Sequence, residues 1–326
     1  MKVLLVGPQP PPFGGVSVYL KRLKRQLENE GHRVDIHDPT KQHLISYYLT
    51  LFLLPFKRYD LISINVQSIY LLLIVFMLGL ASRAQVIDHN WRVLENWPTY
   101  KIRLYSFMLN RFQELVLVGP HLRIYYETHG VRLPLTTRML SPFLPPLLDE
   151  EEAILKTYSP ETHEFVATHS PLLIANAPRV VFYKGLDLYG LDMCVELVAG
   201  LKQEFRDVGL LFAIGEMDDD AYYRQIQSRI AELGIAGNVY FLTRQKEMWP
   251  LLKKADLMVR PTCTDAYGIS VAEALYLGCA AVASDVCERA NGTILFVNRN
   301  KDDFLLKCRQ VLERPGTKKQ KAIWGE

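Results

Sequence analysis

Two carboxylates stand eight positions apart, on either side of a glycine, in the second half of the chain. Asp265 comes before Gly268 and Glu273 comes after it, at the point where an apolar segment becomes a helical pattern. Residues 255–261 have the composition of a short buried strand, and residues 270–277 have the apolar spacing of a helix. The two carboxylates therefore bracket the start of a helix that follows a strand.

The start of this helix has the chemistry of an anion site. The first N–H groups of a helix have no acceptor within it, and the helix dipole is positive at that end. The backbone there is therefore expected to bind a phosphate. The donor-binding positions predicted here are Tyr267, Gly268, Ile269, Ser270 and Val271.

Two roles are open for the side chains of Asp265 and Glu273. Glu273, one turn into the helix, can accept hydrogen bonds from a ribose diol, and Asp265, free in its loop, can meet a sugar hydroxyl. In the alternative, Asp265 caps a turn and Glu273 only complements the helix dipole. The sequence leaves both interpretations open.

Residues 265–273 resemble the E-x(7)-E motif of family 4 retaining glycosyltransferases, with Asp265 in place of the first Glu. The flanking residues 260–262 and 274–285 resemble the nucleotide-sugar domain of that family, and residues 3–16 resemble its opening strand and glycine loop. The similarity extends from residue 1 to about residue 310. It implies the GT-B fold, in which two Rossmann-like, doubly wound parallel-sheet domains face a central cleft.

The resemblance also assigns residues in the first half of the chain. It implies that Gly14 and Gly15 contact the phosphate or sugar of the donor, and that His89, after the fourth strand, approaches the transferred sugar. A tight turn after three prolines is the other interpretation of the glycines. A satisfied core histidine is the other interpretation of His89.

The basic residues that would neutralise the diphosphate are less clear. The family has a G-R…K-G pattern after the first strand of its second domain, and this chain departs from it, with Arg179, Lys184 and Tyr189-Gly190. One or both of Arg179 and Lys184 are expected to contact the diphosphate, with a solvated surface position as the alternative. Gly215 is expected on a loop near the nucleotide.

Asp218, Asp219 and Asp220 match the D-x-D pattern of metal-dependent glycosyltransferases. They also begin a helical pattern, where Asp caps the helix and complements its dipole. We therefore expect no metal site and no cofactor, with the nucleotide sugar as a substrate.

Length and composition suit a globular protein of two domains. The chain has 326 residues, of which 49% are hydrophobic and 22% charged. Strands and helices alternate in both halves, and residues 142–165, rich in proline and then acidic, look like a linker. The predicted domains are 1–147, on the acceptor side, and 148–326, for the donor.

Twelve strands are expected along the chain. The strands are expected at 1–6, 33–37, 59–66, 84–89, 115–118, 171–175, 180–183, 209–215, 238–242, 256–259, 280–283 and 293–297.

Cysteine usage and the first residues favour a cytoplasmic protein. The five cysteines are odd in number, confined to the second half and never spaced as C-x-x-C, so neither a disulfide framework nor a zinc knuckle is expected. Met1 and Lys2 lead directly into a core strand, which disfavours a cleaved signal peptide.

The charge is distributed unevenly along the chain. Residues 1–148 hold 17 Lys and Arg against 9 Asp and Glu, a net +8, which leaves 21 against 26, a net −5, for the rest. A basic first half favours an anionic acceptor or an acidic membrane face. Nucleic acid is disfavoured, because no basic run is interleaved with stacking aromatics.

Two apolar segments could contact a membrane. Residues 69–81 are too few to span a bilayer, so a helix buried on the sheet is expected. Residues 43–56, with aromatic side chains and basic flanks, could lie in a membrane interface, with a core helix as the alternative.

These features together predict a hexosyltransferase-type glycosyltransferase of polysaccharide biosynthesis, cytoplasmic and peripheral to the inner face of the membrane. Glu273 would hold the ribose, the helix amides and a basic residue would stabilise the diphosphate, and Asp265, His89 and Gly15 would orient the sugar. The acceptor would be a hydroxyl, with a lipid-linked glycan as one candidate. The alternatives are a nucleotide-sugar 2-epimerase and a catalytically silent scaffold that binds nucleotide sugar.

Overall fold

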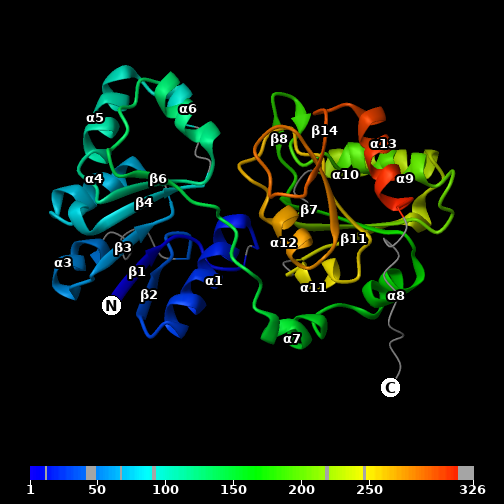
Figure 1. Cartoon of the computed structure of the whole chain (residues 1–326), viewed down its shortest axis with the longest axis horizontal. Helices are drawn as coiled ribbons and strands as arrows, with labels where there is room; N and C mark the ends of the chain where they lie inside the picture. Colours follow the sequence, from blue (N-terminus) through cyan, green and yellow to red (C-terminus); the bar gives the residue numbers. More distant parts are fainter. Residues whose placement is uncertain are drawn as a thin grey trace. The chain divides into compact units, whose positions relative to one another are not determined.

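The computed structural model of the whole chain describes residues 1–11, 13–41, 49–66, 68–89, 93–216, 220–244 and 247–314. The chain divides into two compact units, residues 1–144 and residues 145–326. Both are parallel α/β units, so the predicted fold class is confirmed (Figure 1).

The first unit is built on a six-stranded parallel sheet with the order β2-β1-β3-β4-β5-β6. Its strands are β1 (Lys2–Val6), β2 (Arg33–His37), β3 (Leu61–Ile64), β4 (Ala84–Asp88), β5 (Glu114–Leu117) and β6 (Thr137–Met139). Its helices are α1 (Gly15–Asn29), α3 (Leu54–Lys57), α4 (Ile69–Met77), α5 (Thr99–Leu109) and α6 (Pro120–Thr128), with 3-10 turns η1 (Ala81–Arg83) and η2 (Leu94–Asn96). The strand order reverses beside β1, as in doubly wound folds.

The second unit repeats this plan with the order β11-β10-β7-β12-β13-β14. Its sheet strands are β7 (Leu172–Arg179), β10 (Gly209–Glu216), β11 (Val239–Leu242), β12 (Leu257–Arg260), β13 (Ala280–Ser284) and β14 (Ile294–Phe296). Its helices are α7 (Glu151–Leu155), α8 (Pro160–Thr168), α9 (Leu191–Leu201), α10 (Asp220–Glu232), α11 (Trp249–Leu252), α12 (Ile269–Tyr276) and α13 (Lys301–Leu312), with 3-10 turns η3 (Leu148–Glu150) and η4 (Ala236–Asn238).

Both faces of the second sheet are covered by helices, which explains its continuously apolar strands. Alternate residues of β7 enter two different cores, because side chains of a strand point to opposite faces in turn. Leu173 packs with α9, α10 and α13, whereas Leu172 and Ile174 pack with α8, α11 and α12. Figure 1 shows these two helical layers on either side of β7 and β10.

One predicted strand pairs differently from the prediction. Residues 180–183 were expected to form a separate strand of the sheet, but β7 already extends to Arg179. The residues that follow form a short antiparallel hairpin of β8 (Phe182–Tyr183) and β9 (Leu186–Asp187) (Figure 1). A β-branched, aromatic run favours extended backbone without fixing which strand it pairs with.

The two apolar segments have different outcomes. The segment at 69–81 forms helix α4, whose inner face is buried and whose Tyr70 and Met77 are exposed. Part of the 43–56 segment lies outside the described residues, and its remaining part exposes Phe52, Leu53 and Phe56. Among the residues that the structure describes, no helix is both long enough and apolar enough to cross a bilayer.

Candidate functional site

The predicted donor site lies where strand β12 passes through a short loop into helix α12. Gly268 is the N-cap residue of α12 and has a φ of 79°, in the left-handed region that glycine adopts without steric cost. A Cβ atom at this position would also lie 2.5 Å from Nη1 of Arg289. Gly268 therefore both turns the chain into the helix and leaves room for the arginine beside it.

The N-terminus of α12 presents unused hydrogen-bond donors. The N–H groups of Val271 and Ala272 donate to the Gly268 carbonyl at 2.9 and 3.3 Å, so the Val271 amide is not one of the free donors at this helix start. Among the described residues, the N–H groups of Ile269 and Ser270 have no acceptor. The buried Ser270 Oγ also has no hydrogen-bond partner in the described part of the chain. A buried polar atom without a partner is uncommon, and a bound ligand would satisfy it.

Glu273 lies on the same face of α12 as Ser270, because residues three apart in a helix are neighbours. Its side chain is buried, with 7% exposed. A buried carboxylate is costly unless it accepts hydrogen bonds, so this position is unlike a surface residue that only complements a dipole. The structure thus brings Glu273, Ser270 and the free amides of α12 to one place.

Asp265 does not stand free in its loop as expected. Its Oδ2 accepts hydrogen bonds from Nη1 of Arg289 at 2.7 Å and from Nε of Arg260 at 3.0 Å, and its Oδ1 accepts one from the Ala266 N–H. Burial alone would raise the pKa of Asp265, but the two guanidinium groups overcome this and hold the pKa below its ordinary value. The expectation of a free carboxylate is wrong, because Arg260, five residues before it, and Arg289, 24 residues after it, both donate hydrogen bonds to it.

Arg289 is the centre of this cluster, and no pattern in the sequence selected it. Its side chain is 2% exposed. Besides Asp265, it donates to the Ser284 carbonyl, to the Thr262 and Ser284 hydroxyls and, at 3.4 Å, to the Tyr267 carbonyl. These bonds tie the loop before α12 to the end of β13. Tyr267, a predicted donor-binding residue, therefore lies in a loop of fixed geometry.

The start of helix α9 is held by another residue that the sequence did not single out. Asp187 is buried and accepts hydrogen bonds from the N–H groups of Tyr189 and Leu191 and from the Tyr222 hydroxyl. Gly190, the N-cap residue of α9, lies against the residue after β12, since a Cβ there would be 2.4 Å from the Pro261 carbonyl oxygen. The starts of α9 and α12 are thus both anchored beside β12.

The predicted basic residues Arg179 and Lys184 are both exposed. Arg179 is the last residue of β7, and Lys184 occupies the turn of the β8–β9 hairpin with a φ of 51° and its Nζ 5.3 Å from the Tyr183 ring centroid. In the family's G-R…K-G pattern, the short loop itself would position the two cationic side chains. In this chain, neither Arg179 nor Lys184 forms an ion pair with another described residue.

Two further predictions concern the segment around residue 216. Gly215 lies within strand β10, which pairs with β7 as far as Glu216, so its predicted place on a loop is wrong. Asp218 and Asp219 lie outside the described residues, and Asp220 begins α10. Within the described ranges, no three His, Cys, Asp or Glu side chains gather as they would around a metal ion.

The predicted residues of the first unit gather around the start of α1. Gly14 is the N-cap residue of α1, and its N–H donates to the Ser17 hydroxyl at 3.0 Å. Gly15 begins the helix, and a Cβ at Gly14 would meet no atom within 4 Å. The backbone at this turn is therefore open to the approach of a ligand.

His89 follows strand β4 and lies 5.1 Å, ring to ring, from Tyr19 of α1. Its Nε2 is 3.0 Å from Oδ1 of Asn65, whose amide nitrogen donates to Ser63. Nε2 therefore carries a proton, and the other ring nitrogen of a neutral imidazole is an acceptor. Burial lowers the pKa of His89 to about 4, so the ring is neutral at neutral pH.

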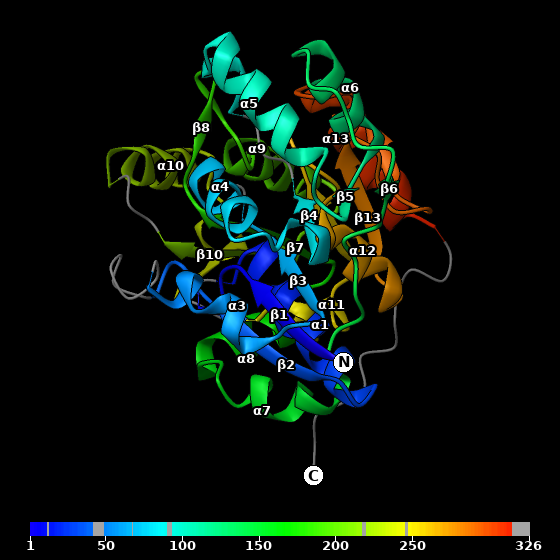
Figure 2. The same cartoon turned by 90° about the vertical axis from the view of Figure 1, so that its left-hand side faces the viewer.

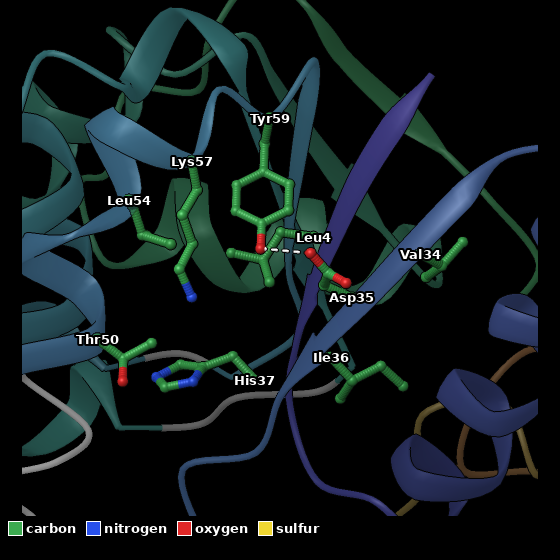
Figure 3. A pocket seen from close by; sticks show the side chains of 9 residues that line it. All are labelled: Leu4, Val34, Asp35, Ile36, His37, Thr50, Leu54, Lys57 and Tyr59. Carbon is green, nitrogen blue, oxygen red and sulfur yellow. Dashed lines mark hydrogen bonds between the residues drawn. The ribbon is translucent and has the colours of Figure 1, made fainter.

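A separate pocket of about 370 Å³ lies in the first unit, between β2 and α3 (Figure 3). Figure 3 shows the Tyr59 hydroxyl directed to Asp35, to which it donates a hydrogen bond of 2.7 Å, and the Lys57 amine directed into the space. None of the predicted site residues lines this pocket. It is distinct from the turn at Gly14 and from His89.

Comparison with known proteins supports the resemblance seen in the motifs. The family model "Glycosyl transferases group 1" matches residues 167–325. The lipopolysaccharide glucosyltransferase WaaG of Escherichia coli (strain K12) is 29% identical over 102 residues. That match covers 31% of this chain and 26% of WaaG, so the chain aligns with about a quarter of the length of this relative.

Solved structures share the fold of the chain at low identity. Anabaena Alr3699/HepE in complex with UDP-glucose has a TM-score of 0.66 at 16% identity, covering 96% of this chain and 90% of that one. A WaaG structure has a TM-score of 0.64 at 17% identity, covering 96% and 91%. The two parallel α/β units thus share the GT-B fold of these structures, and the second unit is similar to the glycosyl transferases group 1 family.

Proposed function

We propose that this protein transfers a sugar from a nucleoside-diphosphate sugar to a hydroxyl acceptor, with retention at the anomeric carbon and without a metal ion. The observation that carries the proposal is the start of α12, where two free amides, the unpartnered Ser270 hydroxyl and the buried Glu273 lie together. The HepE structure with UDP-glucose supports a nucleotide sugar as the donor.

The proposed roles follow from the charge and geometry of each group. The Ile269 and Ser270 amides, at the positive end of a helix, stabilise the departing diphosphate, while Glu273 accepts hydrogen bonds from the ribose. Stabilisation of the leaving group by fixed dipoles and cations removes the need for a metal ion. His89, neutral and with an acceptor nitrogen, and the open turn at Gly14 and Gly15 suit a neutral sugar. No nucleophilic side chain is required when the acceptor oxygen attacks on the face from which the diphosphate leaves.

The acceptor is proposed to be carried by an anionic membrane, as a lipid-linked glycan would be, at the cytoplasmic face. Helix α5 supports this, because it exposes Tyr100, Leu104 and Phe107 along one side. The residues from 97 to 111 include three basic residues and no acidic one. Figure 2 shows α5 at the edge of its unit, next to α4. An apolar, aromatic and basic helical face is typical of proteins that bind the membrane interface.

Two measurements test the proposed reaction. A thermal-shift screen of nucleoside diphosphates should raise the melting temperature, because a ligand at 100 times its dissociation constant adds about 2.7 kcal/mol to stability. The matching labelled nucleotide sugar should then be consumed with a lipid extract as acceptor, and EDTA should leave the rate unchanged. No stabilisation by any nucleoside diphosphate would refute the proposal.

A catalytically silent nucleotide-sugar-binding scaffold is the second candidate. The observation in its favour is Asp265, whose carboxylate is occupied by two arginines rather than open to a sugar. The labelled-donor experiment separates the two functions, since a scaffold binds the nucleotide and leaves the donor intact.

A further inference from the structure

Arg260, the last residue of β12, is held at the carboxyl edge of the second sheet from three directions. Its Nε donates to Asp265 at 3.0 Å. Its Nη1 donates to the carbonyl and to the side-chain oxygen of Asn176, on β7, at 3.2 and 3.1 Å. Its guanidinium carbon lies 5.2 Å from the Tyr189 ring centroid, within the range of a cation–π contact.

These contacts leave one edge of the guanidinium unused. Arginine has five N–H donors, and among the described residues those on Nη2 of Arg260 have no acceptor. Arg289 differs, since its Nε, Nη1 and Nη2 all donate to protein oxygens. The two arginines share one carboxylate, that of Asp265, so the three groups together carry a charge of +1. Of the two arginines, Arg260 is the one with N–H groups that have no acceptor among the described residues.

The position of Arg260 points these donors to an anionic ligand. Carboxyl edges of parallel sheets and helix N-termini are where phosphates bind, and Arg260 ends β12 and contacts both Tyr189, just before α9, and Asp265, in the loop before α12. Its side chain remains 11% exposed, so a ligand can reach it. We propose that Arg260 binds the diphosphate of the donor through Nη2, an assignment that rests on the proposed function.

Arg260 suits this role better than the two basic residues that the motif suggested. Arg179 and Lys184 are exposed, so each would lose rotamer freedom on binding, and water would screen its charge. Arg260 is already immobilised by Asp265, Asn176 and Tyr189, and a pre-ordered donor loses less entropy when it binds. Asp265 is then a positioning residue, which acts on the donor by orienting Arg260.

The test compares a nucleoside diphosphate with its own nucleoside. Calorimetric titration of the wild-type protein with ADP, CDP, GDP and UDP selects the tightest diphosphate, and its nucleoside serves as the ligand without phosphate. Arg260→Gln is expected to weaken the diphosphate about 10- to 100-fold and to leave nucleoside binding unchanged, because a hydrogen bond between charged groups is lost. Arg206→Gln, at an exposed arginine of the same unit that belongs to no predicted site, is the control and is expected to weaken the diphosphate less than about 3-fold.

The outcomes separate this inference from the proposed function. A wild-type protein that binds none of the four diphosphates would refute the proposed function itself. If the wild-type protein binds a diphosphate, two results for Arg260→Gln would overturn the role of Arg260 alone. The variant could keep full diphosphate affinity, or it could lose diphosphate and nucleoside affinity equally. If Arg260→Gln does not fold, Arg260→Lys decides, because it keeps the charge and loses the Nη2 donors. It should weaken the diphosphate about 3- to 10-fold and spare the nucleoside, and unchanged diphosphate affinity would overturn the inference.

Discussion

The two units place their cationic side chains differently. The second unit buries Arg260 and Arg289 at the carboxyl edge of its sheet, around a single carboxylate. The first unit has uncharged contacts around His89, buries Arg22 of α1, which donates to the Leu144 carbonyl, and carries further basic residues outside, on α5. Buried cations interact strongly and at fixed geometry, whereas exposed cations act weakly and in number. This contrast is the basis for proposing one anionic ligand in one pose for the second unit and an extended anionic surface for the first.

The largest expected effect comes from removing the central buried cation. Arg289→Met should lower the free energy of unfolding by about 3–5 kcal/mol, because it leaves Asp265 buried with one of its two cations missing. Urea unfolding followed by circular dichroism measures this change. Arg229→Met, at an exposed ion pair, is the control and should lower stability far less. Equal losses in the two variants would contradict the idea that the second unit depends on buried charge.

The surface of the first unit should dominate binding to anionic vesicles. Replacing Lys101, Arg103 and Arg111 with Gln should weaken the partition to vesicles of mixed anionic and zwitterionic lipid by about 3 kcal/mol, roughly 1 kcal/mol per charge. Co-sedimentation at low and high salt measures it, and the wild-type affinity should fall with salt. The control replaces three exposed arginines of the second unit, Arg206, Arg224 and Arg244. Equal effects of the two triple variants would remove the contrast between the units.

Glu273→Gln tests the buried carboxylate of the second unit. A charged acceptor against ribose hydroxyls contributes about 1.5–3 kcal/mol, so nucleotide affinity should fall about 10- to 150-fold. A helix-dipole role alone would cost about 0.3–1 kcal/mol of stability and leave nucleotide affinity unchanged. Calorimetric titration and melting temperature on one preparation distinguish the two, with the exposed Glu232→Gln as the control.

Local pattern was sufficient to predict most of the fold and part of the site. The apolar strands, the α12 start and Gly268 follow from residues close together in sequence. The prediction that the Asp265 carboxylate is free was wrong because its partner Arg289 lies 24 residues further on, and no spacing rule links the two. The β8–β9 hairpin and the position of Gly215 within a strand were also missed. Strand propensity predicts extended backbone, but where a strand ends and what it pairs with depend on its partner strand, which lies elsewhere in the chain. The contact between Asn65 and His89 could have been predicted from one feature of the sequence, a polar residue directly after strand β3.

The pH response of Asp265 sharpens the comparison further. The two arginines hold its pKa below the ordinary value of 3.8, so the stability gained from its ionised form is present above that pH and is lost only as pH falls through the lower folded pKa. The stability difference between wild type and Asp265→Asn should be about 1.5–3 kcal/mol, constant from pH 7 to pH 5, and should shrink only below about pH 4. Unfolding free energies measured across this range decide it. A difference that already falls between pH 7 and pH 5 would show that the carboxylate is not held by the arginines.

The smallest expected effect concerns His89, the neutral counterpart in the first unit. Its pKa is lowered from 6.5 to about 4 by burial, so between these values the unfolded chain binds a proton that the folded ring does not. Wild-type stability should therefore fall as pH drops from about 6.5 to 4, relative to His89→Gln, which does not titrate and can still donate to Asn65. The change should be no more than about 1–2 kcal/mol, because the ring is partly exposed and solvent screens it. The exposed His163→Gln is the control. Unfolding free energies measured from pH 7 to pH 4 test this, and a wild-type stability that does not fall relative to His89→Gln would show that the folded ring is not held neutral.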